Sequence, residues 1–417
     1  MGDMILYRST ARYVESKPSY DDYTIMTVVI DESNPDPTTC CSYADDAVGM
    51  PSGGDANAQW QEFFGYKPCL FKNGQVVGYL NPNDYSKFED GGSADIVSGD
   101  AGDVMIEFPR RGLKAERDGN LLRVSITDAP DNPDFQYYAF TRDGIIKDKM
   151  YVSAYPAYLR TSSEPYSLGS RSGVKGGWVE ITKNSSEVFD YYRSAAKVNG
   201  ECYELFGFHT YQYISSMIVL QFKTIDTANA VSFMQHGYDY YYRTGNGNLS
   251  GLFAKWSRAD SSDLGKPSKT FGIENLFIQQ TLLDGIYTIG TRNDVSLAVT
   301  MASMEQPSSD YENWEPIYSA THFVDYPIAA YDYLSRVSGT SKAIWLPDKI
   351  EGSSTTYYKT DVNILRTYDF IFTVFSNINK SSMGSDIYYG IVAFDIYNDR
   401  VAGDSDHYAP IIRLCYV

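Results

Sequence analysis

The sequence predicts a mainly β chain of the α+β class: an N-terminal antiparallel β region, then two helices, then a loop-rich antiparallel sheet. Three observations support this fold class. Turn signals recur about every 10 residues between positions 21 and 155, as in a small antiparallel sandwich or barrel. Two later segments carry apolar residues at helical spacing. After Asp226, short strand patterns alternate with long loops rich in Gly, Ser and Asn, which is typical of an α+β protein.

The N-terminal strands are predicted from local patterns. Residues 23–30 form a β-branched run, which favours a strand. Asn73 and Gly74 lie between two apolar runs and predict a hairpin, because this pair adopts the positive φ angles of a type I′ turn. Residues 103–108 alternate polar and apolar side chains, so we expect a half-buried strand there.

Two helices are predicted near the middle of the chain. The first begins at Ser185 or Ser186, either of which can cap it, and ends before Gly200. The second runs from about 203 to 225. Their apolar faces consist of Val188, Tyr191, Tyr192, Ala195 and Val198 in the first helix, and Phe208, Tyr211, Ile214, Ile218, Val219 and Phe222 in the second.

The charge and composition of the chain limit the classes of molecule that it is expected to bind. The formal net charge is −18, and no dense cluster of Lys and Arg is present, so binding to nucleic acid or to an anionic membrane is not expected. No run of about 18 apolar residues predicts membrane insertion. The 37 tyrosines fit half-buried strand faces, and they also fit a rigid binding surface.

The five cysteines indicate a reducing compartment. Their number is odd and Cys40 and Cys41 are adjacent, which does not fit a dense disulfide framework. The N-terminus lacks the charged and apolar regions of a secretory signal. We therefore expect free thiols and synthesis in a cytoplasm.

A series of segments in the second half of the chain occurs in a characteristic order. They are residues 222–229 at the exit of the second helix, Gly-Ile-Glu-Asn at 272–275, Asp-Gly at 284–285, a loop at 346–358, and two closing strands at 390–399 and 411–414. In this order they resemble the C-type-lectin-like domains of many phage tail proteins. The same fold occurs in variable proteins of diversity-generating retroelements and in formylglycine-generating enzymes.

Upstream segments at 43–50, 60–82 and 94–109 resemble a recurring phage module, so the likeness covers most of residues 22–417. The chain departs from the family at 278–281, which replace a Trp-rich core. The resemblance implies three parts, namely an attachment or linker segment at 1–20, a β-rich domain at 21–160 and a C-type-lectin-like domain at 161–417.

Catalysis is not expected. Formylglycine-generating relatives use two reactive cysteines near the C-terminal end, whereas only Cys415 lies there, in an apparent strand, where packing is the simpler role. The four histidines lack metal-ligand spacing, and Asx-rich turns explain Asp45-Asp46 and residues 131–134 better than calcium does. We therefore expect no catalytic residue, no metal and no cofactor. A hydrolase of surface polysaccharide stays an alternative, because acidic residues are plentiful enough to supply its carboxylate pair.

The resemblance places ligand contacts in loops beside the final strands. Rings there can stack on a sugar or peptide while short polar groups orient it. The alternative is that these tyrosines pack inward or against a neighbouring subunit. The candidate ligand-binding residues are Tyr388, Tyr389, Tyr397, Asn398, Asp399, Asp406, His407 and Tyr408, with Trp314 from a separate cluster.

The resemblance implies a bacteriophage virion surface protein that binds a host-cell receptor, either a bacterial surface glycan or a protein. The N-terminal region is expected to contact other phage structural proteins, and a homotrimer follows by analogy. Several copies acting together would strengthen attachment. The second hypothesis is a structural head-fibre or capsid decoration protein.

Overall fold

The computed structural model describes most of the N-terminal half of the chain and separate segments of the C-terminal half. The described residues are 20–161, 165–174, 185–231, 244–255, 267–276, 281–291, 294–299, 318–319, 323–324, 334–350, 356–358, 363–364, 372–376, 394–396 and 413–417.

A four-stranded antiparallel sheet begins the fold. Its order is β2 (Cys41–Asp45), β1 (Ile25–Asp31), β8 (Leu121–Thr127) and β7 (Gly112–Asp118). In β1, Val28 and Ile30 are fully buried while Val29 between them is partly exposed. Val28 and Ile30 therefore face the core, and Thr27 on the opposite face is buried as well.

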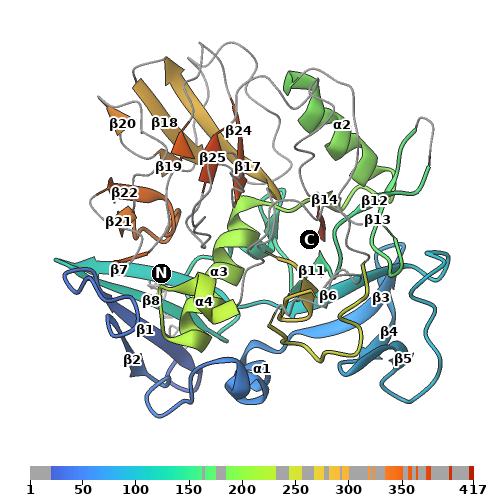
Figure 1. Cartoon of the computed structure of the whole chain (residues 1–417), viewed down its shortest axis with the longest axis horizontal. Helices are drawn as coiled ribbons and strands as arrows, with labels where there is room; N and C mark the ends of the chain where they lie inside the picture. The colour runs from blue at the N-terminus through green and yellow to red at the C-terminus, as the bar shows by residue number, and fades with distance from the viewer. Residues whose placement is uncertain are drawn as a thin grey trace, which may run out of the picture.

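A seven-stranded sheet carries strands from both ends of the chain (Figure 1). Its order is β14 (Tyr203–Leu205), β26 (Leu414–Tyr416), β11 (Lys149–Ser153), β6 (Asp103–Pro109), β3 (Lys67–Lys72), β4 (Gln75–Asn81) and β5 (Asp84–Phe88). β26 pairs with β11 on one side and with β14 on the other, so the C-terminal strand lies between two strands from the first half of the chain.

A third sheet lies in the C-terminal half. It contains β19 (Tyr318–Ser319), β18 (Asp294–Val299), β17 (Thr281–Thr291), β24 (Phe372–Ser376), β25 (Phe394–Ile396) and β23 (Asn363–Ile364), with β20 (Phe323–Val324) also on β18. Smaller pairs are β9 (Thr141–Arg142) with β10 (Ile145–Ile146), β12 (Tyr158–Leu159) with β13 (Leu168–Gly169), β15 (Lys269–Thr270) with β16 (Ile273–Glu274), and β21 (Leu334–Val337) with β22 (Pro347–Ile350).

The described helices are few. They are α1 (Asn57–Phe64), α2 (Ser185–Lys197), α3 (Phe208–Phe222) and α4 (Thr227–Val231), with the short 3₁₀ helices η1 (Gly54–Ala56) and η2 (Tyr138–Phe140). None of these helices is long and apolar enough to cross a membrane.

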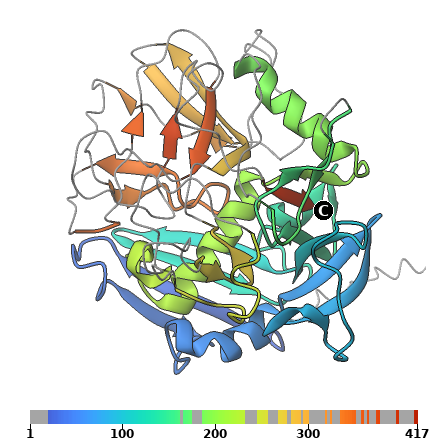
Figure 2. The ribbon, with the colours of Figure 1, turned by 45° about the vertical axis from the view of Figure 1, so that its right-hand side comes forward.

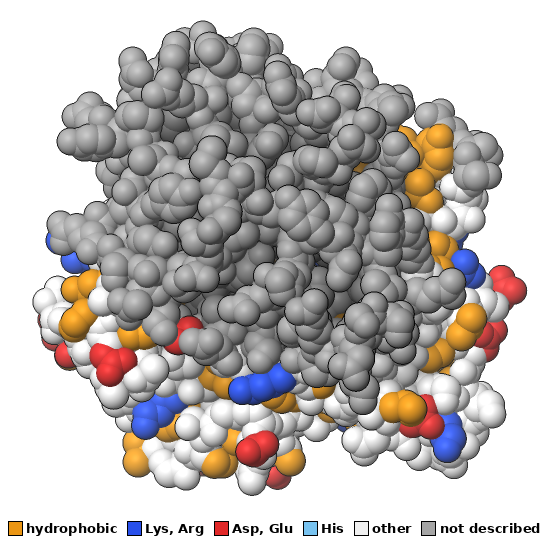
Figure 3. Space-filling model, viewed as in Figure 1, with side chains coloured by type: hydrophobic (Ala, Val, Ile, Leu, Met, Phe, Trp, Pro, Cys, Tyr) orange, Lys and Arg blue, Asp and Glu red, His pale blue; other side chains and the backbone are white. Residues whose placement is uncertain are grey.

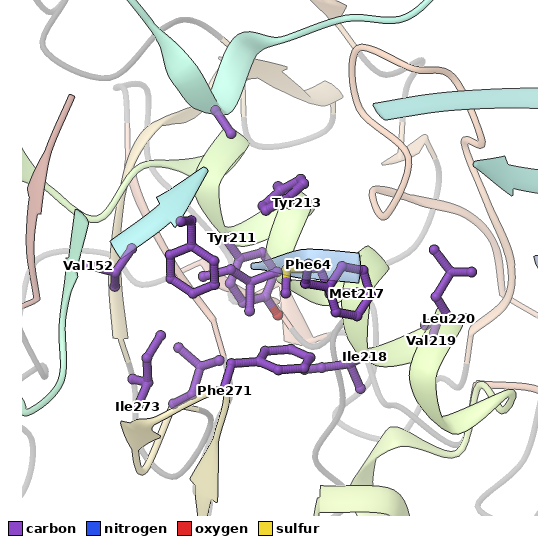
Figure 4. Close-up of a cluster of buried hydrophobic side chains, with 14 of the residues drawn as sticks. Phe64, Val152, Tyr211, Tyr213, Met217, Ile218, Val219, Leu220, Phe271 and Ile273 are labelled. Atoms are coloured by element: carbon purple, nitrogen blue, oxygen red, sulfur yellow. The ribbon is translucent and has the colours of Figure 1, made fainter. Parts of the chain in front are cut away.

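Helix α3 is the centre of the core. It contacts β1 and β8 on one side and β17 on another, and it lies centrally in both ribbon views (Figures 1 and 2). Every residue from Phe208 to Gln221 is buried, as expected of a helix packed on all sides. Figure 4 shows side chains of α3 gathered with Phe64 from α1, Val152 from β11, and Phe271 and Ile273 from the β15–β16 hairpin.

The described chain is mainly β with few helices, and its sheets are antiparallel apart from the β23–β25 pair, which agrees with the predicted fold class. The hairpin at Asn73-Gly74 is confirmed, since both residues have positive φ, at 53° and 78°. The first helix is also confirmed, and Gly200 follows it with φ 135°.

Two local predictions were wrong. The second helix begins at Phe208 and not near 203, because residues 203–205 pair with the C-terminal strand and Gly207 is extended. The strand at 103–108 is not half-buried. All six residues are buried, because α2 and a cluster of aromatic side chains cover the second face of the sheet.

Candidate functional site

A row of directly opposed residues crosses five strands of the seven-stranded sheet. Tyr203 lies opposite Tyr416, Tyr416 opposite Tyr151, Tyr151 opposite Glu107, and Glu107 opposite Lys67. Directly opposed residues share one face of a sheet. The row therefore places three tyrosines, a carboxylate and an ammonium group side by side.

Glu107 is the centre of the polar end of this row. Both of its carboxylate oxygens accept the Tyr79 hydroxyl at 3.1 Å, and Oε2 also accepts the Tyr151 hydroxyl at 2.9 Å. Lys149 Nζ lies 2.8 Å from Oε1. The Glu107 side chain is only 7% exposed, whereas that of Lys149 is 44% exposed. Lys149 and Tyr79 therefore stand between Glu107 and solvent.

The electrostatics of this cluster keep its donors protonated. Burial, followed by the nearby Glu107 charge, raises the pKa values of Tyr151 and Tyr79. The hydrogen bond with Glu107 raises the pKa of Lys149. The tyrosines are neutral donors and Lys149 is charged at neutral pH, so the cluster is a fixed set of hydrogen-bonding groups rather than an acid–base pair.

The two ends of the row differ in exposure. At the tyrosine end, Phe71 packs against Tyr151 and Tyr416 with ring centroids 4.3 and 4.7 Å apart. Helix α2 covers this end with Tyr192, Ala195 and Ala196. At the other end, Lys67 is exposed and its Nζ lies 5.3 Å from the centre of the partly exposed Tyr79 ring. This face of the sheet is therefore covered by α2 at its tyrosine end and exposed to solvent at its Lys67 end.

The open end presents the Tyr79 ring and the ammonium groups of Lys67 and Lys149. These groups on a rigid sheet can contact the hydroxyl groups of a polar ligand, and the rigidity of the sheet lowers the entropy cost of binding. Glycoside hydrolysis requires a second carboxylate across a groove, and no second one contacts this cluster in the described chain. Across the described residues, no group of three or more His, Cys, Asp or Glu could hold a metal ion.

A second cluster of polar residues is buried in the interior of the protein. It contains Glu274 from the Gly-Ile-Glu-Asn segment, which accepts the backbone N–H groups of Gly245 and Gly247 at 2.9 and 2.8 Å. Burial raises the pKa of Glu274 and lowers the pKa of Lys269, which donates to the Gly247 carbonyl and lies 3.6 Å from the Tyr85 ring centre. All of these side chains are enclosed, so this centre joins segments of the fold and offers no access to a ligand.

The nine candidate ligand contacts predicted from the sequence lie outside the described residues. They are Tyr388, Tyr389, Tyr397, Asn398, Asp399, Asp406, His407, Tyr408 and Trp314. The structure does not test these nine residues as ligand contacts, and they stay predictions.

Three other candidate positions, at Cys415, at residues 131–134 and at Asp45-Asp46, lie within the described residues. Cys415 is buried in β26, with its sulfur 3.9 Å from the Thr210 hydroxyl. Asn132 accepts the backbone N–H of Asp134 at 3.0 Å, which is an Asx turn as predicted. Asp45 contacts Arg123 and Thr27, and Asp46 accepts the backbone N–H of Ile25. These contacts give the acidic residues structural roles.

The Glu107 cluster is not among the sites predicted from the sequence. The available signal was weak: residues 103–108 contain two acidic side chains in an otherwise apolar strand. Both are buried with a basic partner, Asp103 with Arg160 and Glu107 with Lys149. Their partners come from separate segments, which only the folded chain brings together.

Figure 3 shows the described part of one surface, where basic, acidic and apolar side chains are interspersed. Comparison with protein-family models gives no match for this chain. The search of curated proteins finds no match either.

Proposed function

We propose that this chain is a non-enzymatic binding protein on the surface of a bacteriophage particle, where it attaches the particle to a host-cell receptor. The observation that carries the binding role is the Glu107 cluster, in which two tyrosine hydroxyls and an ammonium group surround a carboxylate at the open end of an aromatic sheet face. The phage context rests on the resemblance of the sequence to phage tail proteins.

The order of elements supports the C-type-lectin-like part of this proposal. Helices α2 and α3 come first, the sheet around β17 and β24 follows, and the chain ends in β26 beside β11 and β14. β14, from the chain between β11 and β26, pairs with β26 in the same sheet, so the C-terminal region is built onto the N-terminal strands. We propose that the N-terminal region attaches the chain to the particle while loops of the C-terminal region extend toward a receptor.

The proposed ligand is a bacterial surface glycan, since the open face offers the Tyr79 ring and the ammonium groups of Lys67 and Lys149 as hydrogen-bond donors. The predicted loop contacts, including Tyr397 and Tyr408, would extend the same binding role. We propose the virion as the site of action, other virion proteins as N-terminal partners, and a homotrimer as the assembly.

A structural fibre or decoration protein is the second candidate. One observation favours it: Ile145 and Ile146 in the β9–β10 hairpin are 58% and 42% exposed, although both are large and apolar. Exposed apolar pairs are common at protein contacts. On this alternative, the hairpin would contact another virion protein.

The binding proposal is tested with labelled full-length protein on host cells and on isolated envelope polysaccharide. The double variant Tyr79→Phe with Lys149→Met keeps the ring and the aliphatic stem but removes two polar groups. We expect about tenfold weaker binding, equivalent to roughly 1.4 kcal/mol. Arg123→Ala on the four-stranded sheet is the control and should bind normally.

A triple variant of Tyr397, Asp406 and Tyr408 tests the loops separately. Loss of binding only in this variant would move the contact from the sheet face to the loops. Normal saturation by both folded variants would refute the contacts proposed for both regions.

A further inference from the structure

Three Asn-Gly pairs occur in the chain, at 73–74, 199–200 and 246–247. In such a pair the side-chain amide of the asparagine can react with the next backbone nitrogen, because glycine has no side chain to shield that nitrogen. The surroundings of the three pairs differ in the structure, so their reactivity should differ as well. This inference does not rest on the proposed function.

The first pair lies in an exposed turn. Asn73 and Gly74 are the two residues between β3 and β4, where Lys72 pairs with Gln75. The Asn73 side chain is exposed and Gly74 is partly exposed. Among the described residues, neither the Asn73 side chain nor the Gly74 N–H has a hydrogen-bond partner. No contact therefore holds these two groups apart, and water can reach both.

The second pair is held by hydrogen bonds. Asn199 Nδ2 donates to the Leu168 carbonyl at 2.7 Å, and Asn199 Oδ1 accepts the Ser167 hydroxyl at 2.9 Å. The Gly200 N–H donates to the Lys197 carbonyl at 2.9 Å. All of these hydrogen bonds must break or rearrange before the Asn199 amide can meet the Gly200 nitrogen.

The third pair is held at its glycine. Gly247 is buried, and its N–H donates to Glu274 Oε1 at 2.8 Å. Glu274 Oε2 accepts the Gly245 N–H at 2.9 Å, so the residues on both sides of Asn246 are fixed on one carboxylate. The Asn246 side chain is exposed, but the nitrogen that would attack it is held in the interior.

We propose that Asn73 is the site of spontaneous deamidation in the folded protein. The Gly74 backbone nitrogen attacks Asn73 Cγ to form a cyclic imide, and the bond from Cγ to Nδ2 breaks. The amide group leaves as ammonia with the proton of the Gly74 N–H. Water then opens the imide at either carbonyl and gives aspartate or isoaspartate, and no electron is transferred.

Isoaspartate at this turn should weaken the contact between the hairpin and the C-terminal strand. It adds a methylene group to the backbone, whereas the register of β3 and β4 depends on the length of the turn. A Cβ on Gly74 would lie 2.8 Å from the Tyr416 hydroxyl, so the turn packs closely on β26. We expect the isoaspartate form to melt at a lower temperature than freshly prepared protein.

The test is incubation of the full-length protein in mildly alkaline buffer, which favours loss of the Gly74 proton, followed by peptide mapping with mass spectrometry. Isoaspartate is detected with an isoaspartate methyltransferase. We expect Asn73 to react about tenfold faster than Asn199 or Asn246, equivalent to a difference of roughly 1.4 kcal/mol in barrier. In urea the three should react at similar rates, because the protecting hydrogen bonds and burial are lost.

Ser167→Ala is a matched variant, because it removes a donor from Asn199 and leaves the first pair unchanged. It should speed deamidation at Asn199 and not at Asn73. Equal rates at the three pairs in the folded protein would overturn the proposal, as would faster reaction at Asn199 or Asn246. An Asn73 that reacts in urea but not in the folded protein would overturn it too.

Discussion

The Tyr151 hydroxyl donates a 2.9 Å hydrogen bond to Glu107 Oε2 across the neighbouring strands β11 and β6. Both residues are buried, yet Lys149 on the same carboxylate reaches solvent. The contact thus joins the aromatic interior of the sheet face to its open end, and it makes the position of Glu107 sensitive to changes on either side.

Replacing Glu107 tests how far the cluster stabilises the fold. Glu107→Ala leaves the Tyr151 hydroxyl without its acceptor, and an unsatisfied buried donor costs about 1–3 kcal/mol. We expect the free energy of unfolding in urea to fall by that amount. Lys67→Ala changes an exposed residue of the same row and should alter it by less than about 0.5 kcal/mol. Equal effects of the two changes would contradict the assigned geometry.

Two salt bridges on the four-stranded sheet should differ sharply in strength. Arg117 and Glu32 are 15% and 3% exposed, whereas Arg123 and Asp45 are 40% and 44% exposed. Glu32 also accepts the Tyr358 hydroxyl and the backbone N–H of Val337, so it connects the sheet to later segments.

Arg117→Ala should therefore destabilise the protein by about 3–5 kcal/mol, because it leaves a buried carboxylate without its cation. Arg123→Ala should cost at most about 1 kcal/mol. Chemical denaturation of both variants measures the difference. Similar losses of unfolding free energy in the two variants would show that the buried Arg117–Glu32 pair stabilises the fold no more than the exposed pair does.

His209 should make stability depend on acid pH. Burial lowers its pKa from 6.5 to about 3, and neither ring nitrogen has a hydrogen-bond partner within the described structure. Above pH 6.5 the folded and unfolded states are both neutral at this residue. As the pH falls, the unfolded chain takes up the proton first, so the free energy of unfolding falls between pH 6.5 and 3, by at most ~5 kcal/mol.

The variant His209→Phe removes this titration and can pack against Tyr138, whose ring centre lies 4.9 Å from that of His209. Its stability relative to the unaltered protein should increase steadily as the pH falls below 6.5, as measured by urea midpoints. A constant difference across this range would show that His209 is protonated equally easily in both states.

Gly74 and Gly119 offer a matched test of hairpin packing. Both have positive φ, at 78° and 60°, but a Cβ on Gly74 would lie 2.8 Å from the Tyr416 hydroxyl, whereas one on Gly119 would meet nothing within 4 Å. Alanine at either site incurs about 1 kcal/mol of backbone strain. Gly74→Ala should lose roughly a further 1 kcal/mol through displacement of Tyr416. Equal melting temperatures would indicate that the hairpin does not pack on Tyr416.

Local features of the fold could be predicted from sequence, whereas long-range ones could not. The Asn73-Gly74 hairpin and the helix before Gly200 depend on neighbouring residues and were predicted correctly. The strand at 203–205 was assigned to a helix, because its partner, β26, lies at the other end of the chain. Sequence periodicity carries no information about such a partner.

The Glu107 cluster could not be predicted from the sequence for the same reason, because its residues are far apart along the chain. Glu107 and Tyr151 are 44 positions apart, and Tyr79 is 28 positions from Glu107. Their meeting depends on the register of β4, β6 and β11, which no short motif encodes. The tyrosine-rich composition suggested binding surfaces, but Tyr66, Tyr85, Tyr155, Tyr211 and Tyr213 are fully buried and serve the core.

Immunogold electron microscopy of intact particles, with antibody against residues 180–417, tests whether this chain is a receptor-binding protein on a phage particle. We expect label at the tail tip or at fibre ends. Label spread over the head would contradict receptor binding and favour the structural role. Absence of label from intact particles, with the antibody active on purified protein, would contradict the virion assignment.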